Sequence, residues 1–334
     1  MQFRLYLTIL MAVTLVSWFT SHAEESTRRD EMSQQSKTYN LSGFTGVYAS
    51  AAVDVELTQG DAFSVVAYTE SGDFSGLELR VKDGVLIATR PEEIWKDKNT
   101  SSWQRFFGIG SGNRNISIKR VNGQRLIKIN GERVPTYTVR VTAPGIDRLD
   151  ASSSSIVTAK EIKTRDLAIK ASSSGDINAE VMGGDVSVDA SSSGDVILSG
   201  TCDNLDIKAS SSADVKAGDL TCQHGNLRST SSSSIRAKVA GGDVSVDATS
   251  SGEVVLSGTC EKLDIKTTSG AEVKASDLTC QHGNLRASSG ADITAMLTET
   301  VNAHASSGGD ILVRGGAKPI KVTESSGGDV SIRN

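Results

Sequence analysis

The chain has 334 residues, a formal net charge of −5 and a hydrophobic content of 37%, and its aromatic content is only 4%. This charge argues against nucleic acid as a partner, because phosphate backbones are bound by basic faces. No Phe, Tyr or Trp follows Tyr137, so the second half of the chain must build its core from Val, Ile, Leu and Ala. Such side chains suit a thin interior between closely spaced sheets better than a wide globular core.

Residues 1–23 have the pattern of a secretory signal peptide. Arg4 precedes an apolar run from Leu5 to Phe19, and Ser21-His22-Ala23 has the small-x-small form of a cleavage site. A retained membrane anchor is the alternative, but the run is short for a membrane span. We therefore expect a protein that spans no membrane after signal cleavage. We expect it in the periplasm, or extracellular and on the cell surface of a Gram-negative-type bacterium, where disulfides persist.

The region that follows predicts a leader and then an N-terminal β region. Residues 24–38 are polar without a period and predict a disordered leader. Within residues 39–148, apolar and polar residues alternate from Val53 to Leu57, as in a half-buried strand. Asp83-Gly84 is a hairpin signal between two further apolar stretches.

Residues 90–136 interrupt this β region with an aromatic and basic insertion. A hairpin is expected around Asn122-Gly123, and the rest reads as loop. The aromatic residues are the candidate binding residues, since they could stack on sugar rings or seat a partner protein. Alternatively, they fold back to cover an end or a flank of the main fold. These residues are Trp95, Trp103, Phe106 and Phe107.

A repeat organises residues 149–334. Each unit has the form apolar-x-apolar-x-small, then a serine-rich run, then acidic-apolar, and the units recur with a period near twenty. At a larger scale, the segment Gly184–Arg228 returns further along the chain as Gly242–Arg286. A strand-like repeat of this period predicts an all-β fold, a single-stranded parallel β-helix (β-solenoid) of short coils of about 19 residues. The serine runs are expected at the corners, where equivalent residues stack coil over coil.

The four cysteines fit this stacking. The interval from Cys202 to Cys222 is about one coil, and the interval from Cys260 to Cys280 is the same. Equivalent positions of consecutive coils should approach to roughly 5 Å, within reach of a disulfide, whereas pairing Cys222 with Cys260 would skip a coil at roughly 10 Å. The sequence therefore predicts the disulfides Cys202–Cys222 and Cys260–Cys280.

The sequence gives weaker support to other roles for these cysteines. Free thiols are one alternative, and a metal site that uses Cys222 with His224 or Cys280 with His282 is another, although two ligands per coil give thin support. We expect no metal site, no cofactor and no catalytic residue. A serine nucleophile would need a base held within reach by a third group, and no such pattern is present.

A column of acidic residues is expected beside the serine corners. Calcium held between coils is one interpretation, and support of the turns by local hydrogen bonds is the favoured one. The acidic residues are Asp176, Asp195, Asp214, Glu253, Glu272, Asp292, Asp310 and Asp329. Lysines are expected to offset the repulsion, and they are Lys170, Lys208, Lys216, Lys266 and Lys274.

Several short motifs in this order resemble a known family. They are Phe44-Thr-Gly-Val-Tyr, Asp83-Gly84-Val-Leu-Ile, Val139-Arg-Val-Thr-Ala-Pro144 and the tandem Ser-Ser-Gly-Asp corners. The sequence resembles the "putative auto-transporter adhesin, head GIN domain" family over residues 39–334, apart from the aromatic insertion. The resemblance implies a right-handed parallel β-helix akin to pectin-lyase-like folds, in exported bacterial proteins without established catalytic residues.

These observations favour an exported, non-catalytic β-helix protein that serves adhesion or an envelope or surface interaction. One alternative is a polysaccharide-active enzyme, a lyase or hydrolase, on the same scaffold. Such an enzyme needs a cleft walled by long loops, and the regular coils after residue 149 carry no insertions. The other alternative is an envelope scaffold that binds a protein through residues 90–136. The expected partner is an envelope or surface glycan or protein, and a homo-oligomer is possible.

Overall fold

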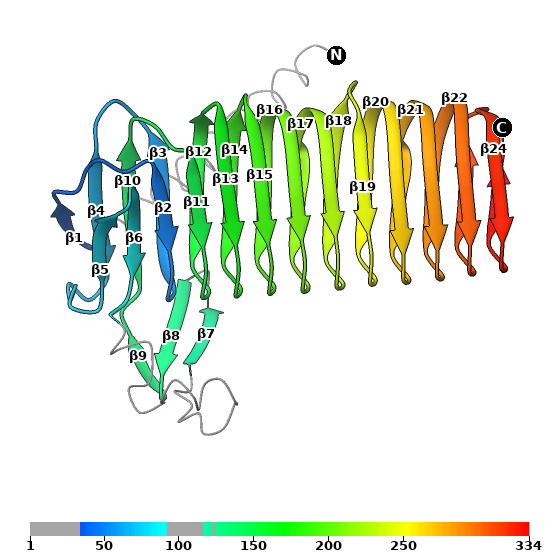
Figure 1. Cartoon of the computed structure of the whole chain (residues 1–334). Helices are drawn as coiled ribbons and strands as arrows, with labels where there is room; N and C mark the ends of the chain where they lie inside the picture. Colours follow the sequence, from blue (N-terminus) through cyan, green and yellow to red (C-terminus); the bar gives the residue numbers. More distant parts are fainter. Residues whose placement is uncertain (1–33, 92–115, 122–123, 334) are drawn as a thin grey trace, which may run out of the picture.

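The computed structural model describes residues 34–91, 116–121 and 124–333, and these form strands and turns without a helix (Figure 1). The predicted signal peptide and the aromatic residues Trp95, Trp103, Phe106 and Phe107 lie outside the described residues. Part of the predicted leader is ordered instead. Residues Gln35–Tyr39 form strand β1, which pairs antiparallel with β4. Its side chains are mostly exposed and polar, so its backbone contacts carry the pairing, and the composition contained no signal of it.

Antiparallel strands close the N-terminal end of the molecule. Strand β4 (Ser64–Thr69) lies between β1 and β10 (Tyr137–Ala143), and β10 also pairs parallel with β3 (Val53–Gln59). The remaining strands of this region are β2 (Gly46–Ala49), β5 (Glu78–Lys82) and β6 (Val85–Thr89). From β2 and β3 onward the pairing with later strands is parallel.

The rest of the chain is a β-solenoid of about 10 turns, as predicted. Each coil has about 19 residues and lies beside the next in parallel register, with Asp185 beside Asn204 and Asn204 beside His224. In Figure 1 the strands of the front face run downward while the chain advances to the right, which is a right-handed winding. The strands are β11 (Arg148–Ala151), β12 (Ile156–Lys163), β13 (Asp166–Ala171), β14 (Asp176–Met182), β15 (Asp185–Ala190), β16 (Asp195–Ala209), β17 (Asp214–Ser229), β18 (Ser234–Ala240), β19 (Val244–Ala248), β20 (Glu253–Thr268), β21 (Glu272–Ser288), β22 (Asp292–Ser306), β23 (Asp310–Arg314), β24 (Lys318–Ser325) and β25 (Asp329–Ile332).

The core is a narrow column of small aliphatic side chains. Along β16, Leu205, Ile207 and Ala209 are buried, while the intervening Asp206 and Lys208 point outward. The same alternation recurs in the other coils because successive side chains of a strand point to opposite faces. No aromatic ring contributes to this core after Tyr137, so it consists of aliphatic side chains, alanines and the two disulfides.

The serine runs form the tight turns at the lower edge of the solenoid in Figure 1, as predicted. In one coil Ser211 and Ser212 both have positive φ, 52° and 63°, and the Ala213 N–H donates to the Ser210 carbonyl at 3.2 Å. Two consecutive left-handed residues closed by this bond make a type I′ turn. The turns also bond to one another, since the Ser212 N–H donates to the carbonyl of Ser231 in the next coil at 3.1 Å.

The described part of the insertion is a separate antiparallel sheet beside the N-terminal end of this serine edge (Figure 1). It contains β7 (Ile116–Val121), β8 (Gln124–Ile129) and β9 (Glu132–Val134). Arg125 of β8 forms an ion pair with Asp54 and donates to the Ser154 carbonyl, which ties the insertion to the solenoid. At the base of the insertion, the buried Arg90 donates from Nε to the Ala51 carbonyl at 3.0 Å.

The last coil differs from those before it. In β24, Pro319 stands beside Val301 and Glu324 beside Ala305, both at inward positions of the preceding coil. The register shifts between these two pairs, and Ile320 is 68% exposed. Proline, an inward charge and a bulge are features that discourage another strand from pairing with a sheet edge.

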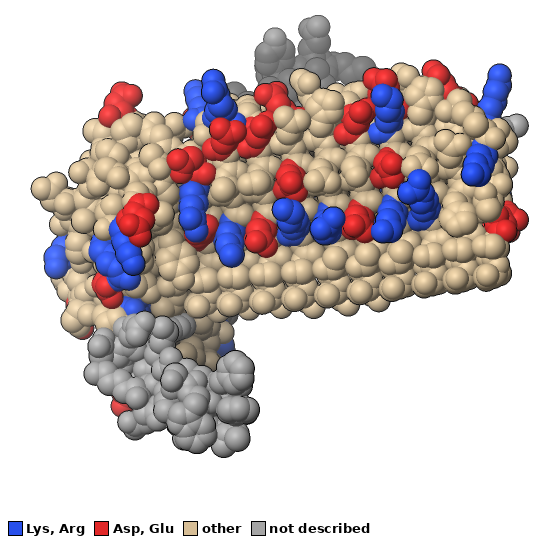
Figure 2. Space-filling model, in the orientation of Figure 1, with Lys and Arg blue, Asp and Glu red and all other residues tan. Residues whose placement is uncertain are grey.

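The charged side chains of the front face lie in rows along the solenoid axis (Figure 2). The row nearest the serine edge is mixed in sign, and the surface between this row and the edge carries no charged side chain in that view. The parallel register aligns the members of this lower row, which are Lys170, Asp189, Lys208, Arg228, Asp247, Lys266 and Arg286.

Candidate functional site

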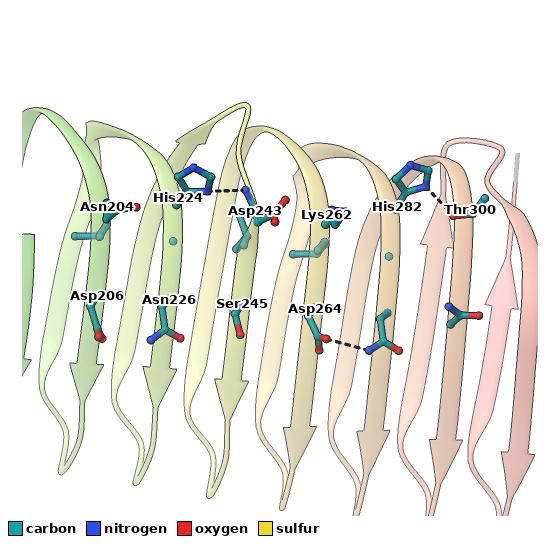
Figure 3. A pocket seen from close by; sticks show the side chains of 17 residues that line it. Asn204, Asp206, His224, Asn226, Asp243, Ser245, Lys262, Asp264, His282 and Thr300 are labelled. Carbon is teal, nitrogen blue, oxygen red and sulfur yellow. Dashed lines mark hydrogen bonds between the residues drawn. The ribbon is translucent and has the colours of Figure 1, made fainter. Parts of the chain in front are cut away.

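A shallow groove of 740 Å³ runs along the front face of the solenoid, between two further rows of outward side chains (Figure 3). Equivalent residues of consecutive coils form each row, because the strands are in parallel register. The upper row contains Asn204, His224, Asp243, Lys262, His282 and Thr300. The middle row, the next outward position along each strand, contains Asp206, Asn226, Ser245, Asp264, Asn284 and Asn302.

The floor of the groove is the strand segment between the upper and middle rows. Its residues occupy inward positions, and two of them are glycines, Gly225 and Gly283. A Cβ on Gly283 would lie 2.3 Å from Leu297 Cδ1, so Leu297 would have to move to admit a side chain there, whereas a Cβ on Gly225 would make ordinary contact with Val239. Leu297 of the neighbouring strand β22 therefore fills the core below Gly283.

Hydrogen bonds orient part of the upper row. The Asp243 backbone N–H donates to Nδ1 of His224 at 3.1 Å, which places the proton of a neutral His224 ring on Nε2. Nδ1 of His282 lies 2.8 Å from Thr300 Oγ1. In the middle row, Asn284 Nδ2 donates to Asp264 Oδ2 at 3.0 Å, across neighbouring coils. The groove thus presents amide, carboxylate, hydroxyl and imidazole groups in repeated positions.

One trio in this region has the order of a hydrolytic triad. Besides its contact with the Thr300 hydroxyl, His282 has Nε2 at 3.6 Å from Glu299 Oε2. The ring is 38% exposed and the carboxylate 57% exposed, and the second distance exceeds a hydrogen bond. The duplicate His224 bonds to a backbone N–H instead, so the trio is not repeated with the sequence.

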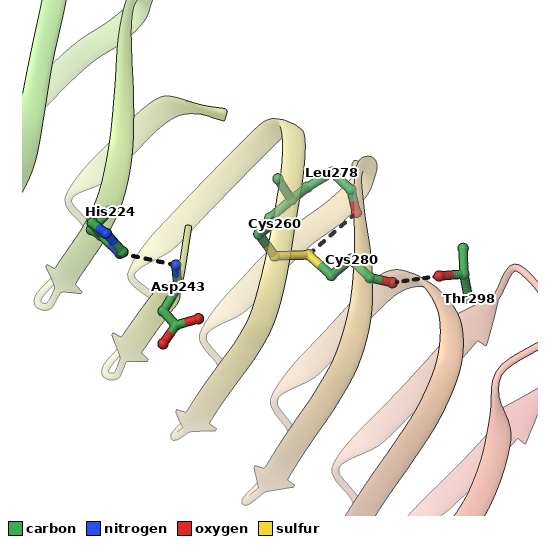
Figure 4. The surroundings of a disulfide bond; sticks show 6 residues. All are labelled: His224, Asp243, Cys260, Leu278, Cys280 and Thr298. Atoms are coloured by element: carbon green, nitrogen blue, oxygen red, sulfur yellow. Dashed lines mark hydrogen bonds between the residues drawn. A yellow bond between two sulfur atoms is a disulfide. The ribbon is translucent and has the colours of Figure 1, made fainter. Parts of the chain in front are cut away.

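Both predicted disulfides are present, and Figure 4 shows the one between Cys260 and Cys280. The Cα atoms of Cys202 and Cys222 are 4.7 Å apart, and those of Cys260 and Cys280 are 4.5 Å apart. The cysteines lie in strands, facing the core, just before the upper row of the groove. Each disulfide therefore ties together two coils that form the groove wall.

The metal and calcium interpretations gain no support from the geometry. Cys222 and Cys280 are bonded to other cysteines, which removes them as thiolate ligands. Across the described parts of the chain, no three His, Cys, Asp or Glu side chains gather as a metal site would need. The acidic column is present in register but is interrupted by Ser234, which stands between Asp214 and Glu253.

Two of the five predicted lysines offset the acidic column, whereas Lys170, Lys208 and Lys266 lie in the lower row instead. Lys216 Nζ lies 2.8 Å from Asp214 Oδ2, and Lys274 Nζ lies 2.8 Å from Glu253 Oε1 and 2.9 Å from Glu272 Oε2. These contacts raise the pKa of both lysines. Further along the column, burial, Asp310 and Glu272 together raise the pKa of Asp292 above its ordinary value of 3.8.

The sequence reasoning missed the groove itself. Loops do not wall it, and the absence of insertions had suggested that the regular coils carry no hollow. A signal was available in the duplicated His-Gly-Asn segments at 224–226 and 282–284. Each places a glycine between two polar residues, where the other coils have an aliphatic residue.

Two solved structures align with most of the chain. A "putative lipid binding protein" from Parabacteroides distasonis is 17% identical, with 90% of this chain and 97% of that chain covered and a TM-score of 0.45. A "putative adhesin" from Parabacteroides merdae is 14% identical, with the same coverage and a TM-score of 0.43. At these scores the likenesses carry no argument about function.

No helix in the described residues is both long and apolar enough to cross a membrane. No curated protein matches the chain. The profile of one family, described as "Putative auto-transporter adhesin, head GIN domain", matches residues 43–239 and 223–317. The match spans most of the solenoid and the N-terminal β region, so the chain belongs to this family.

Proposed function

We propose that the protein is an exported, non-catalytic binding protein that attaches to a component of the cell envelope or of another surface. The observation that carries the proposal is the groove, in which equivalent polar side chains recur along the axis rather than converge on one reacting atom. Adhesion through such a face agrees with the family description. Two disulfides agree with an oxidising compartment outside the cytoplasm.

The first experiment measures location and binding together. Cells that express the full chain are fractionated, and the purified chain is sedimented with the envelope fraction and, separately, with whole cells. We expect the protein outside the cytoplasm and saturable binding to the envelope or the cells. Retention in the cytoplasm, or no binding to either preparation, contradicts the proposal.

An enzyme remains the second candidate, because His282 lies between Thr300 and Glu299. The purified chain is incubated with a panel of polysaccharides and with ester substrates, and the Thr300→Val variant is the control. Turnover that disappears in Thr300→Val would assign hydrolysis to this trio and replace the non-catalytic proposal. We expect no turnover in either protein.

A further inference from the structure

We propose that the groove binds an extended, uncharged polysaccharide that lies along the solenoid axis and occupies two equivalent subsites. This inference rests on the proposed binding function and names its ligand class. One subsite contains Asp206, His224 and Asn226, and the other contains Asp264, His282 and Asn284.

The internal duplication creates the two subsites. Each residue of the first subsite has its counterpart at the same place of the second copy of the repeat. In the middle row, Asn226 stands beside Ser245, Ser245 beside Asp264 and Asp264 beside Asn284. Equivalent residues are therefore three coils apart, or about 14 Å at ~4.8 Å per coil. A ligand that satisfies both subsites must present the same groups repeatedly along an extended chain.

The groove binds through side chains alone. The strands of the front face pair with neighbours on both sides, so their backbone N–H and C=O groups are used within the sheet. A peptide that adds as a strand needs a free sheet edge, and the groove offers none. Amide and carboxylate side chains instead offer donors and acceptors that suit hydroxyl groups. The spacing of the coils is close to the advance per sugar of an extended β-linked polysaccharide.

Charge and polarity select among such ligands. Three carboxylates line the groove, those of Asp206, Asp243 and Asp264, against one ammonium group, that of Lys262. Like charges repel at this range, so an anionic polymer is disfavoured. A lipid surface is disfavoured as well, because none of the exposed large hydrophobic residues of the described chain lies in the groove.

The lower row of the front face lies outside the groove (Figure 2). Its charges affect which polymers can be used to test the proposal. Over the same coils it contains Lys208, Arg228, Lys266 and Arg286, and only Arg228 has a carboxylate of that row, Asp247, at 3.4 Å. These cations would attract an anionic polymer to the face without seating it in the groove. A uronic-acid polymer therefore distinguishes binding by the groove from attraction to its border.

Open ends allow a polymer to pass through. The groove extends over consecutive coils from Asn204 to Asn302, about 24 Å at ~4.8 Å per coil. The coil before the groove continues with the same pairing, and in the last coil, after a register shift, Lys318 and Lys321 stand beside Thr300 and Asn302 without an insertion that closes the groove. The ligand can therefore bind by an internal stretch, and chain ends are not required.

The test compares groove variants with a matched change elsewhere. The purified full chain is titrated with a neutral linear β-glucan, a neutral mannan and a uronic-acid polymer, and is also sedimented with phospholipid vesicles. Asn226→Ala and Asn284→Ala each remove one amide of the middle row. Asn178→Ala removes an outward amide from β14, on the other sheet, and serves as the control.

We expect a neutral polymer to bind, and each groove variant to weaken binding by a similar factor of about ten, equivalent to ~1.4 kcal/mol. Asn178→Ala is expected to bind like the parent chain. Oligosaccharides long enough to reach both subsites should bind more tightly than shorter ones. Tighter binding of the uronic-acid polymer or of the vesicles, or unchanged binding in both groove variants, overturns the proposal.

Periodate separates this inference from the proposed function. Oxidation of the envelope fraction destroys the vicinal diols of its glycans and leaves most other components intact. Loss of envelope binding after oxidation supports a glycan ligand. Binding that survives oxidation excludes a glycan with vicinal diols, such as a 1,4-linked hexose polymer, as the ligand. Binding that is lost in Trp103→Ala/Phe107→Ala but not in the groove variants overturns the groove as a glycan site. Either result leaves the binding function standing.

Discussion

Cys202 and Cys222 occupy the same register position in neighbouring coils, and a disulfide joins them with the Cα atoms 4.7 Å apart. At the next outward position, Asn204 stands beside His224 in the groove wall. The covalent bond therefore fixes the register of two neighbouring coils just before the upper row of the groove. The second disulfide, Cys260–Cys280, does the same behind the duplicate subsite.

The two disulfides should stabilise the fold equally. Each closes a loop with a sequence separation of 20, which corresponds to about 3 kcal/mol in the free energy of unfolding. Cys202→Ala/Cys222→Ala and Cys260→Ala/Cys280→Ala are compared with the parent chain by urea unfolding. A non-reducing peptide map should link only these pairs. A peptide that joins Cys222 to Cys260 would show that the order of the coils is wrong.

The serine turns should respond to glycine according to position. Ser212 has φ of 63°, a left-handed conformation that costs a non-glycine residue about 1 kcal/mol, and later coils have Gly270 and Gly290 at this place. We expect Ser212→Gly to raise the free energy of unfolding, by up to about 1 kcal/mol, and Ser212→Val to lower it. Ser210→Gly, just before the left-handed pair, is the control and should be destabilising. Urea unfolding measures all three, and a stabilising Ser212→Val contradicts the turn assignment.

Titration of Asp292 in the acidic column should make the free energy of unfolding depend on pH. Its raised pKa means that the folded state binds the proton more tightly than the unfolded state. Stability therefore rises as the pH falls through the window from the raised pKa down to 3.8, and the charged carboxylate costs stability above that window. Asp292→Asn should raise Tm at pH 7. The gain in the free energy of unfolding should be less than about 1 kcal/mol, because the carboxylate is exposed and screened.

The pH profile decides this prediction. Thermal unfolding is followed from pH 3 to pH 8 for the parent chain and for Asp292→Asn. The Tm difference between Asp292→Asn and the parent chain should shrink as the pH falls, and also as salt is added at pH 7. A difference that grows toward low pH contradicts the expected sign.

The edge of β24 should keep the last coil from pairing with another chain. Pro319→Val, Lys321→Asn and Glu324→Ala together restore the residues of the preceding coil, Val301, Asn302 and Ala305. We expect the triple variant to form larger assemblies than the parent chain, measured by light scattering after size-exclusion chromatography. Lys318→Asn keeps the proline and the inward carboxylate and should behave like the parent. A triple variant of unchanged size would show that these residues do not protect the edge.

The stacking order could be predicted from the sequence because the solenoid repeats one local rule. Alternation determines which residues of a coil, such as Leu205 and Ile207, face inward, and the repeat determines which cysteines meet. Strand β1 was missed because a strand of polar residues with no buried side chain looks like a leader. Its pairing depends on the backbone of β4, which lies far along the chain.

The groove escaped for a different reason. The outward positions of the groove strands all read as polar, so the pattern shows which residues are exposed but not which exposed rows enclose a space. That depends on side-chain length along the axis, such as the short Ser245 between Asn226 and Asp264.

The internal duplication has a consequence for how such a molecule changes over generations. One full repeat interval, residues 184–241, supplies three coils, a disulfide and a complete set of groove residues, and its two ends join neighbours in the same register. Gain or loss of a copy would lengthen or shorten the shaft by about 14 Å without disturbing either tip. Recombination between copies would thus change the length of the groove, and with it the affinity for a polymeric ligand, in steps of one copy.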